Sequence, residues 1–231
     1  MCRGATPTSS NLTPTYENIC DLAREVGFDA CGLAPVRRLD ADAAFMDEWV
    51  AAGLNGNMDY LTRNRDLRYD PATLVPGAKT VVVCLLTYAH SGRDYHRTVK
   101  SLLYNLQAQL TEHFGDHLVS PDHQHIFCDS APVLERRWCV EAGLGFIGRN
   151  RQLIHPTLGS MVHPGELVLN VSVPAPPRPV FAGCGDCRRC LDACPTGALR
   201  NPVWDARLCI AYTTHYCLVC QNNCPYNETV T

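Results

Sequence analysis

Four closely spaced cysteines stand near the end of this chain, in the segment Cys184-Gly-Asp-Cys187-Arg-Arg-Cys190-Leu-Asp-Ala-Cys194-Pro195. This is the C-x2-C-x2-C-x3-C-P spacing of bacterial ferredoxins that hold two iron–sulfur clusters. Three thiolates spaced three residues apart can surround one [4Fe–4S] cluster, whereas the fourth, next to proline, points to the neighbouring cluster. A second set of cysteines follows: Cys209, Cys217, Cys220 and Cys224, the last again before a proline. The pattern predicts a small ferredoxin-like module with two [4Fe–4S] clusters.

The crossing of the Cys-Pro ligands divides the eight cysteines into two sets of four. We expect one cluster to be held by Cys184, Cys187, Cys190 and Cys224, and the other by Cys194, Cys209, Cys217 and Cys220. Because each motif lends a ligand to the other cluster, the two clusters should lie close together. Such an arrangement favours the transfer of single electrons at low potential.

Two zinc sites of four cysteines each are the alternative interpretation. Zinc sites usually pair C-x2-C knuckles across a spacer, and they need neither a third cysteine at three-residue spacing nor a Cys-Pro step. A disulfide framework is disfavoured because a chain of 231 residues can build its own core and this one shows no secretion signal. The spacing therefore favours iron–sulfur clusters over zinc.

Composition sets limits on the class of protein. Hydrophobic residues make up 46% of the chain, which is enough for a core, and the formal net charge is −3. This balance gives no overall basic signature for nucleic acid. No apolar run follows the N-terminal charge, and none is long enough to span a membrane. We therefore expect a cytoplasmic protein with no membrane partner and with reduced thiols.

A proline-rich stretch at residues 174–179 separates the cysteine motifs from the preceding sequence. It predicts a boundary between a domain at 1–175 and a module at 176–231. Periodicity and end signals in the first domain predict helices at 15–26, 40–52, 94–114 and 132–142, and strands at 28–33, 79–88, 125–128 and 166–173. The expected fold class is mixed α/β (α+β). No G-x-G-x-x-G follows a strand and no P-loop lysine motif is present, so nothing indicates a dinucleotide or nucleotide triphosphate site.

Three further segments carry residues suited to chemistry: GRDYH at 92–96, DSAPVLER at 129–136 and GLGFIGRN at 143–150. Each also has a structural interpretation. Asp94 and Asp129 can cap the helices that follow them, Gly143 and Gly145 can end a helix, and His96 can be a packed or exposed helix residue. On local pattern alone both interpretations stay open. Asp129 is the more suggestive because it follows a predicted strand, where α/β sheets place ligands.

Taken in order along the chain, these segments resemble the tRNA epoxyqueuosine reductase family. The resemblance covers roughly residues 16–227 and rests on GFDACGLAP, GNMDYLTRN, LVPGAKTVVV, GRDYH, DSAPVLE, AGLGFIGRN, CGDCRRCLDACPTGAL and DARLCIAY. Cysteine pairs alone are weak evidence. Their combination with DSAPVLE and GLGFIGRN is specific.

The resemblance implies a cobalamin-binding, catalytic first domain related to that of reductive dehalogenases, followed by the double-cluster module. Members of the family reduce the epoxide of epoxyqueuosine, at the wobble position of tRNA, to the alkene of queuosine with loss of water. The corrin carries the difficult chemistry, and the protein supplies placement and protons. We also expect a monomer that takes electrons from an external low-potential donor.

Individual roles follow from the same resemblance. Asp129 matches the proton donor of the family, and as a donor it should have its pKa raised by burial beside the corrin. The residues expected to contact cobalamin are Arg68, Asp129, Arg136, Gly148, Arg149 and Asn150.

The chain departs from the family pattern at two places. Only seven residues separate Cys209 from Cys217, where the family usually carries a longer insert, and the chain ends seven residues after Cys224, without a helical-repeat extension. Three functions therefore remain open. The first is a compact epoxyqueuosine reductase acting on tRNA or on a smaller queuosine precursor. The second is a related cobalamin-dependent reductase for dehalogenation or deoxygenation of another small substrate. The third is an iron–sulfur electron carrier or corrinoid activator without substrate chemistry.

Overall fold

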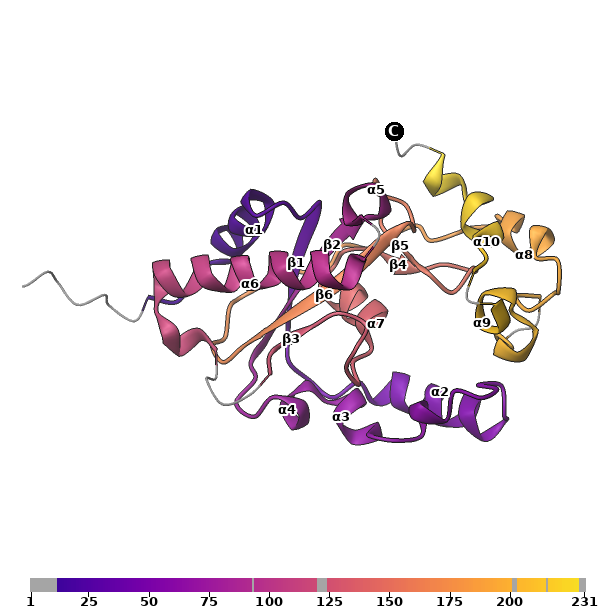
Figure 1. Ribbon diagram of the computed structural model, residues 1–231, viewed down its shortest axis with the longest axis horizontal. Coiled ribbons are helices and arrows are strands. Elements are labelled where there is room, and N and C mark those ends of the chain that lie inside the picture. The colour runs from indigo at the N-terminus through magenta and orange to yellow at the C-terminus, as the bar shows by residue number, and fades with distance from the viewer. Residues whose placement is uncertain (1–11, 93, 120–123, 201–202, 215, 229–231) are drawn as a thin grey trace, which may run out of the picture.

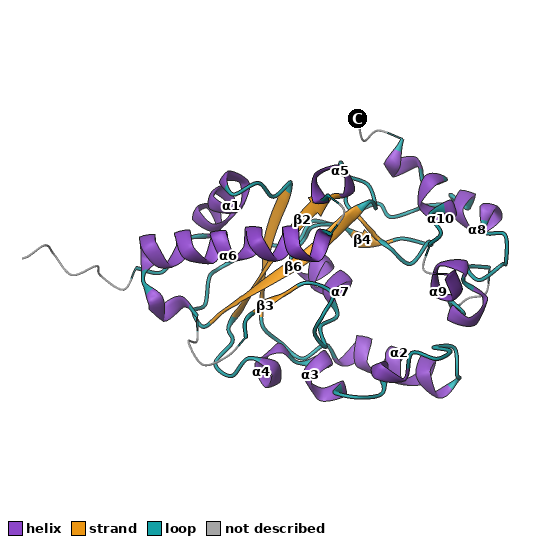
Figure 2. Ribbon diagram, viewed as in Figure 1, coloured by secondary structure: helices purple, strands orange, loops and turns teal. Residues whose placement is uncertain are grey.

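A four-stranded antiparallel sheet forms the centre of the computed structural model, which describes residues 12–92, 94–119, 124–200, 203–214 and 216–228. Its strands lie in the order β1-β2-β6-β3 and comprise Ala30–Pro35, Thr80–Thr87, Val162–Leu169 and Ile126–Phe127 respectively. All three pairings are antiparallel. Figures 1 and 2 show helices on both sides of this sheet.

The central strand β2 is buried along its whole length, as its apolar sequence TVVVCLLT predicts. Alternate side chains serve opposite faces. On one face Val82, Cys84 and Leu86 pack in a core with α1 (Tyr16–Glu25) and α6 (Tyr95–Phe114). On the other face Val81, Val83 and Leu85 pack with Trp138 of α7 (Glu135–Glu141).

Shorter elements connect these layers. They are α2 (Asp40–Ala51), η1 (Asp59–Leu61), α3 (Arg65–Tyr69), α4 (Pro71–Leu74), α5 (Tyr88–Ser91), η2 (Asp116–Leu118), β4 (Phe146–Ile147) and β5 (Leu153–Ile154). Strands β4 and β5 form a separate two-stranded sheet. Within the described ranges, no helix is both long and apolar enough to cross a membrane.

The cysteine-rich part follows as a set of short helices: α8 (Arg189–Ala193), η3 (Ala206–Leu208), α9 (Ile210–Thr214), α10 (Val219–Asn222) and η4 (Pro225–Asn227). It packs against the preceding part of the chain. Trp49 of α2 stacks on Trp204 with ring centroids 5.6 Å apart, and its indole N–H donates to the Trp204 carbonyl at 2.7 Å. The Ser160 amide donates to the Asn227 side chain at 2.6 Å. These contacts fix the cysteine motifs relative to the sheet.

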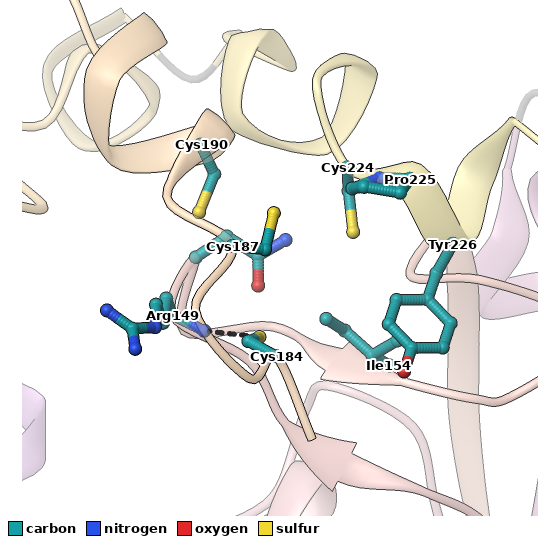
Figure 3. Close-up of a pocket in the computed structure, with 9 residues that line it drawn as sticks. Arg149, Ile154, Cys184, Cys187, Cys190, Cys224, Pro225 and Tyr226 are labelled. Atoms are coloured by element: carbon teal, nitrogen blue, oxygen red, sulfur yellow. Dashed lines mark hydrogen bonds between the residues drawn. The ribbon is translucent and has the colours of Figure 1, made fainter. Parts of the chain in front are cut away.

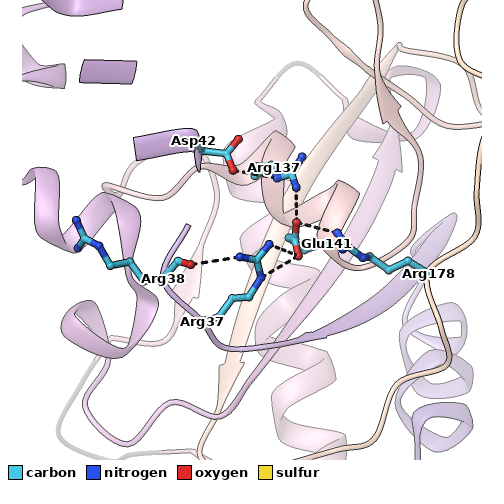
Figure 4. Close-up of polar contacts among 6 residues, drawn as sticks. All are labelled: Arg37, Arg38, Asp42, Arg137, Glu141 and Arg178. Carbon is cyan, nitrogen blue, oxygen red and sulfur yellow. Dashed lines mark hydrogen bonds and ion pairs between the residues drawn. The ribbon is translucent and has the colours of Figure 1, made fainter. Parts of the chain in front are cut away.

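A buried carboxylate holds the proline-rich connection in place (Figure 4). Glu141 of α7 is 6% exposed and pairs with Arg37, Arg137 and Arg178 at 2.9, 2.5 and 2.8 Å. Burial by itself would raise the pKa of Glu141, but the three guanidinium groups together hold it below its ordinary value. Because Arg178 belongs to the connection, the module predicted to begin at 176 is tied to α7 at its first residues. The boundary itself stays a prediction.

Most expected elements are present within two residues, but two differ by more. The strand expected at 166–173 runs over Val162–Leu169 and so includes Pro164 and Gly165, two residues that often interrupt strands. Pro164 pairs with Leu85 of β2 at a point where β3 does not run alongside. A Cβ on Gly165 would meet Val99 of α6, so glycine there lets the helix approach the sheet. The helix expected at 132–142 begins only at Glu135, since the preceding residues form the loop described below.

Candidate functional site

Four cysteines from three segments surround one cavity (Figure 3). Cys184 and Cys187 lie on the loop before α8, Cys190 lies on α8, and Cys224 precedes η4. The cavity has about 340 Å³ of empty space, including its open mouth. The loop is folded tightly, because the Cys187 amide donates to the Cys184 carbonyl at 3.0 Å. The amide of Arg149 donates to the Cys184 sulfur at 3.4 Å, as an N–H group does at a cluster thiolate.

The other four cysteines line a second, larger cavity with about 1280 Å³ of empty space. They are Cys194, Cys209, Cys217 and Cys220. The structure thus groups the eight cysteines in the two sets that the crossing pattern predicts. Their roles as ligands remain a prediction.

The arrangement of the sulfur atoms suits clusters better than single ions. A structural zinc ion needs four ligands about 2.3 Å from one point. Among the described residues, no three His, Cys, Asp or Glu side chains converge closely enough to hold one metal ion. Four thiols around a hollow are the arrangement that a cubane requires. Burial raises the pKa of the Cys220 thiol to about 11, so the cationic iron of a cluster would be needed to keep it ionised.

The expected cobalamin contacts divide into two groups. Arg136 and Asn150 line the second cavity, and Arg149 and Asn150 line the first. Arg68 lines neither cavity, but its guanidinium donates to the carbonyl of Tyr60, which lines the second. Gly148 accounts for the shape of the loop, since a Cβ there would meet Ile154 and Asn150.

Asn150 gives the clearest sign that this wall receives a ligand. The residue is 3% exposed, and its side-chain nitrogen has no hydrogen-bond partner among the described residues. Buried donors are almost always satisfied in folded proteins. An unsatisfied amide beside the cationic side chain of Arg136 suits a ligand rich in amide and phosphate oxygens, such as a corrinoid.

Asp129 lies two residues after the end of β3 and has a left-handed backbone (φ 51°). The hydroxyl of Tyr95 donates to its carboxylate at 2.5 Å, and the Nε2 atom of His96 lies 3.6 Å from the same oxygen. The Asp129 side chain is 61% exposed, so the chain itself does not supply the expected burial. Asp129 does not cap α7, whose N-cap is Leu134.

The structural interpretations of Asp94 and Gly143 are confirmed. Asp94 caps α6 by accepting a hydrogen bond from the Arg97 amide at 3.3 Å. Gly143 follows α7 with φ 74°, a conformation that glycine adopts freely. Arg93 of the GRDYH segment lies outside the described residues.

Four stacked aromatic rings lie next to Asp129, and the sequence analysis did not predict the position of His163 among them. Tyr95 stacks between His96 and His163 with centroids 3.9 and 3.8 Å away, and Tyr88 covers the other face of His163 at 4.3 Å. Burial, followed by the nearby His96, lowers the pKa of His163 to about 4, so its ring is neutral near pH 7. His163 carries no local sequence signal, since only the pairing of β6 brings it to Tyr95.

Two further carboxyl groups near Asp129 were also missed. Burial raises the pKa of Glu135 to about 7, and the charge of Asp129 adds to this effect. Glu166 on β6 is fully buried, and this burial raises its pKa well above the ordinary value. Glu135 was visible as the end of DSAPVLE, but nothing in the sequence separates Glu166 from an ordinary strand residue.

Comparisons with known proteins define first the class and then the family. Residues 183–216 match the 4Fe-4S double cluster binding domain. A catabolic reductive dehalogenase shares the fold, with a TM-score of 0.59 and 17% identity over 91% of this chain and 31% of its own. The chain therefore combines a reductive-dehalogenase-like fold with a double [4Fe–4S] domain.

Closer relatives name the family. An epoxyqueuosine reductase of Leadbetterella byssophila is 33% identical over 89% of this chain and 78% of its own length. The solved Streptococcus thermophilus epoxyqueuosine reductase superimposes with a TM-score of 0.80 at 26% identity, covering 91% of this chain. An epoxyqueuosine reductase solved with an epoxyqueuosine-modified tRNA-Tyr stem loop has a TM-score of 0.79 at 25% identity, covering 92%. The chain spans 65% of the length of each of these two solved chains. It belongs to the epoxyqueuosine reductase family.

Proposed function

We propose that this protein is a cobalamin- and iron–sulfur-dependent reductase that converts the epoxide of epoxyqueuosine in tRNA to the alkene of queuosine. Membership of the epoxyqueuosine reductase family supports epoxyqueuosine as the substrate. The observation in the structure that carries the proposal is the second cavity. It brings four thiols together with Arg136 and the unsatisfied amide of Asn150.

The reaction consumes two electrons and two protons and releases one water molecule for each epoxide reduced. Cobalamin, when bound, would supply a reduced metal centre that opens the epoxide. Arg136, Arg149 and Asn150 would hold its oxygen-rich rim, while Asp129 would donate a proton to the epoxide oxygen as the ring opens. Tyr95 orients the Asp129 carboxyl through its 2.5 Å hydrogen bond.

The short segment between Cys209 and Cys217 does not argue against tRNA as the substrate. It forms α9, and the hydroxyl of Tyr212 accepts a hydrogen bond from the Asn57 amide, so this segment packs on the 56–58 turn. A relative solved with a modified tRNA stem loop supports the same substrate class here. The external low-potential donor, the monomeric state and the cytoplasmic location remain predictions from the sequence.

Metal analysis and an activity assay test the proposal. After anaerobic purification, cluster reconstitution, incubation with cobalamin and desalting, we expect about eight irons and about one cobalt per chain. A tRNA anticodon stem loop carrying epoxyqueuosine should then lose one oxygen atom, as followed by mass spectrometry with a chemical one-electron reductant. Iron without retained cobalt would contradict the cobalamin assignment, and zinc in place of iron would contradict the clusters. Retained cobalt without turnover of the stem loop would exclude this substrate and favour another small one.

A further inference from the structure

The loop that carries Asp129 is held by contacts from two helices. Tyr95 and Lys100, both on α6, donate to the Asp129 carboxylate at 2.5 Å and to the Ser130 hydroxyl at 2.8 Å. From the other side, the backbone N–H of Asp129 donates to the carboxylate of Glu135, the first residue of α7. A left-handed backbone is uncommon for a residue other than glycine, and these surrounding contacts stabilise it at Asp129.

The contact made by Glu135 differs from the other two because it acts on the backbone of Asp129. Tyr95 can follow a rotation of the Asp129 side chain, and Lys100 holds only the next residue. The hydrogen bond from the Asp129 N–H fixes the peptide plane, and with it the direction in which the carboxyl group leaves the chain. A hydrogen bond to an ionised carboxylate is also stronger than one to a neutral acceptor.

We propose that Glu135 is a positioning residue whose ionised carboxylate holds the Asp129 backbone in its left-handed conformation, so that the loop is released when Glu135 takes up a proton. The importance of this hydrogen bond for catalysis rests on the function proposed above. The hydrogen bond itself is a property of the chain, and its effect on the Asp129 backbone can be measured without any substrate.

Charged and titratable groups on every neighbouring element affect the pKa of Glu135. Burial raises its pKa, as does the charge of Asp129, whereas the Asp129 N–H, Arg136 on α7 and Lys100 on α6 act in the opposite direction. Glu166 approaches from β6, because its pairing with Val83 places it on the face of the sheet covered by α7. The remaining titratable neighbours are neutral, since burial raises the pKa of Tyr95, Cys128 and Cys139.

Burial raises the pKa of Glu166 well above its ordinary value and so favours the neutral form of its carboxyl group. It is fully buried, and neither of its carboxyl oxygens has a hydrogen-bond partner among the described residues. A charge there would be uncompensated and would face the charge of Glu135. Glu166→Gln therefore provides a matched control, since it replaces a neighbouring buried carboxyl group with a neutral side chain of similar size and leaves the contact between Glu135 and the Asp129 N–H in place.

Hydrogen exchange at the Asp129 amide tests the proposal on the cluster-loaded protein without substrate, read by mass spectrometry of overlapping peptides. Dividing by the intrinsic exchange rate gives a protection factor that is independent of the direct effect of pH. With a Glu135 pKa of about 7, the neutral fraction rises from about one tenth at pH 8 to about nine tenths at pH 6. We expect protection in the unaltered protein to fall about tenfold over this interval.

Variants of Glu135 separate the effect of its charge on the Asp129 backbone from the effect of its side-chain packing. Glu135→Ala should lose the protection at both pH values. Glu135→Gln, which like protonated Glu135 offers only a neutral acceptor, should show at both pH values the lower protection that the unaltered protein has at pH 6, and Glu166→Gln should behave like the unaltered protein. Equal protection in Glu135→Ala and the unaltered protein would overturn the proposal, as would protection that does not change between pH 8 and pH 6. Neither outcome depends on turnover, so a failed activity assay would leave this inference standing and would affect only the proposed function.

Discussion

Replacing Glu141 with glutamine should destabilise the protein by about 3 kcal/mol, because it removes one negative charge from the centre of three guanidinium groups. Glu141 is 6% exposed, whereas the side chains of Arg37, Arg137 and Arg178 are 46, 31 and 50% exposed. Hydrogen bonds to charged groups contribute about 1.5–3 kcal/mol each, so three would sum to about 4.5–9 kcal/mol. The partly exposed arginines can rebind water in the variant, which reduces the loss to the lower end of the 3–5 kcal/mol typical for breaking a buried ion pair.

Thermal unfolding under anaerobic conditions, followed by tryptophan fluorescence, measures this effect. For a chain of this size, 3 kcal/mol corresponds to a fall in Tm of about 6–12 °C. The matched control is Glu112→Gln on the exposed side of α6, which should change the stability by less than about 0.5 kcal/mol. Arg178→Ala removes a single half-exposed partner and should lower the stability by about 1 kcal/mol at most.

The pH dependence of the same difference gives a second test. Since the arginines lower the pKa of Glu141 in the folded protein, its contribution is fully present above the unfolded value of about 4.5. It is lost as the pH falls through the lower folded value. The gap in Tm between the unaltered protein and Glu141→Gln should therefore be constant at pH 6–8 and shrink below about pH 4.5. A variant that melts within about 2 °C of the unaltered protein at pH 7 would refute the reasoning.

Three further predictions concern the site. Asp129→Asn should lower the rate of epoxide reduction by about 10²–10⁴-fold in single-turnover assays, while electron uptake by the clusters stays unchanged; equal rates would favour a protein without substrate chemistry. Cys224→Ala should reduce the iron content from about eight to about four per chain, measured against Cys20→Ala, which should keep all its iron; full iron in the first variant would contradict the crossing assignment. His163→Phe should keep the ring stack but remove a group whose pKa falls from 6.5 to about 4 on folding. As the pH falls from 6.5 to 4, the Tm of the unaltered protein should therefore decrease more than the Tm of this variant. An identical pH dependence of Tm in both proteins would contradict the lowered pKa of His163.

The parts of the fold that sequence predicts well are those with a strong local pattern. The short run TVVVCLLT is rich in β-branched residues and therefore favours a buried strand, and the 20-residue helix α6 shows a clear apolar stripe that includes Val99, Leu103 and Leu106. The grouping of the cysteines was also predictable, because thiol spacing is dictated by the cluster rather than by distant packing. Pro164 and Gly165 gave the opposite result. As local signals they break a strand, but their position beside α6 and beyond the end of β3 makes them acceptable within one.

The site residues that sequence missed share one physical cause. Glu135, His163 and Glu166 come from a helix and a strand, and only the antiparallel pairing of β6 with β2 and β3 brings them close to Asp129, which the sequence did single out. The environment of each group then follows from the fold and not from its neighbours in sequence. Glu166 and Asp129 are both carboxylic acids, yet the first is fully buried and the second is 61% exposed. Burial was expected at the proposed proton donor, whereas in the chain alone it falls on two neighbouring carboxyl groups. An exposed donor next to buried acids requires that bound cofactor and substrate exclude the water around Asp129, so protonation of this residue should be examined in the loaded protein and not in the chain alone.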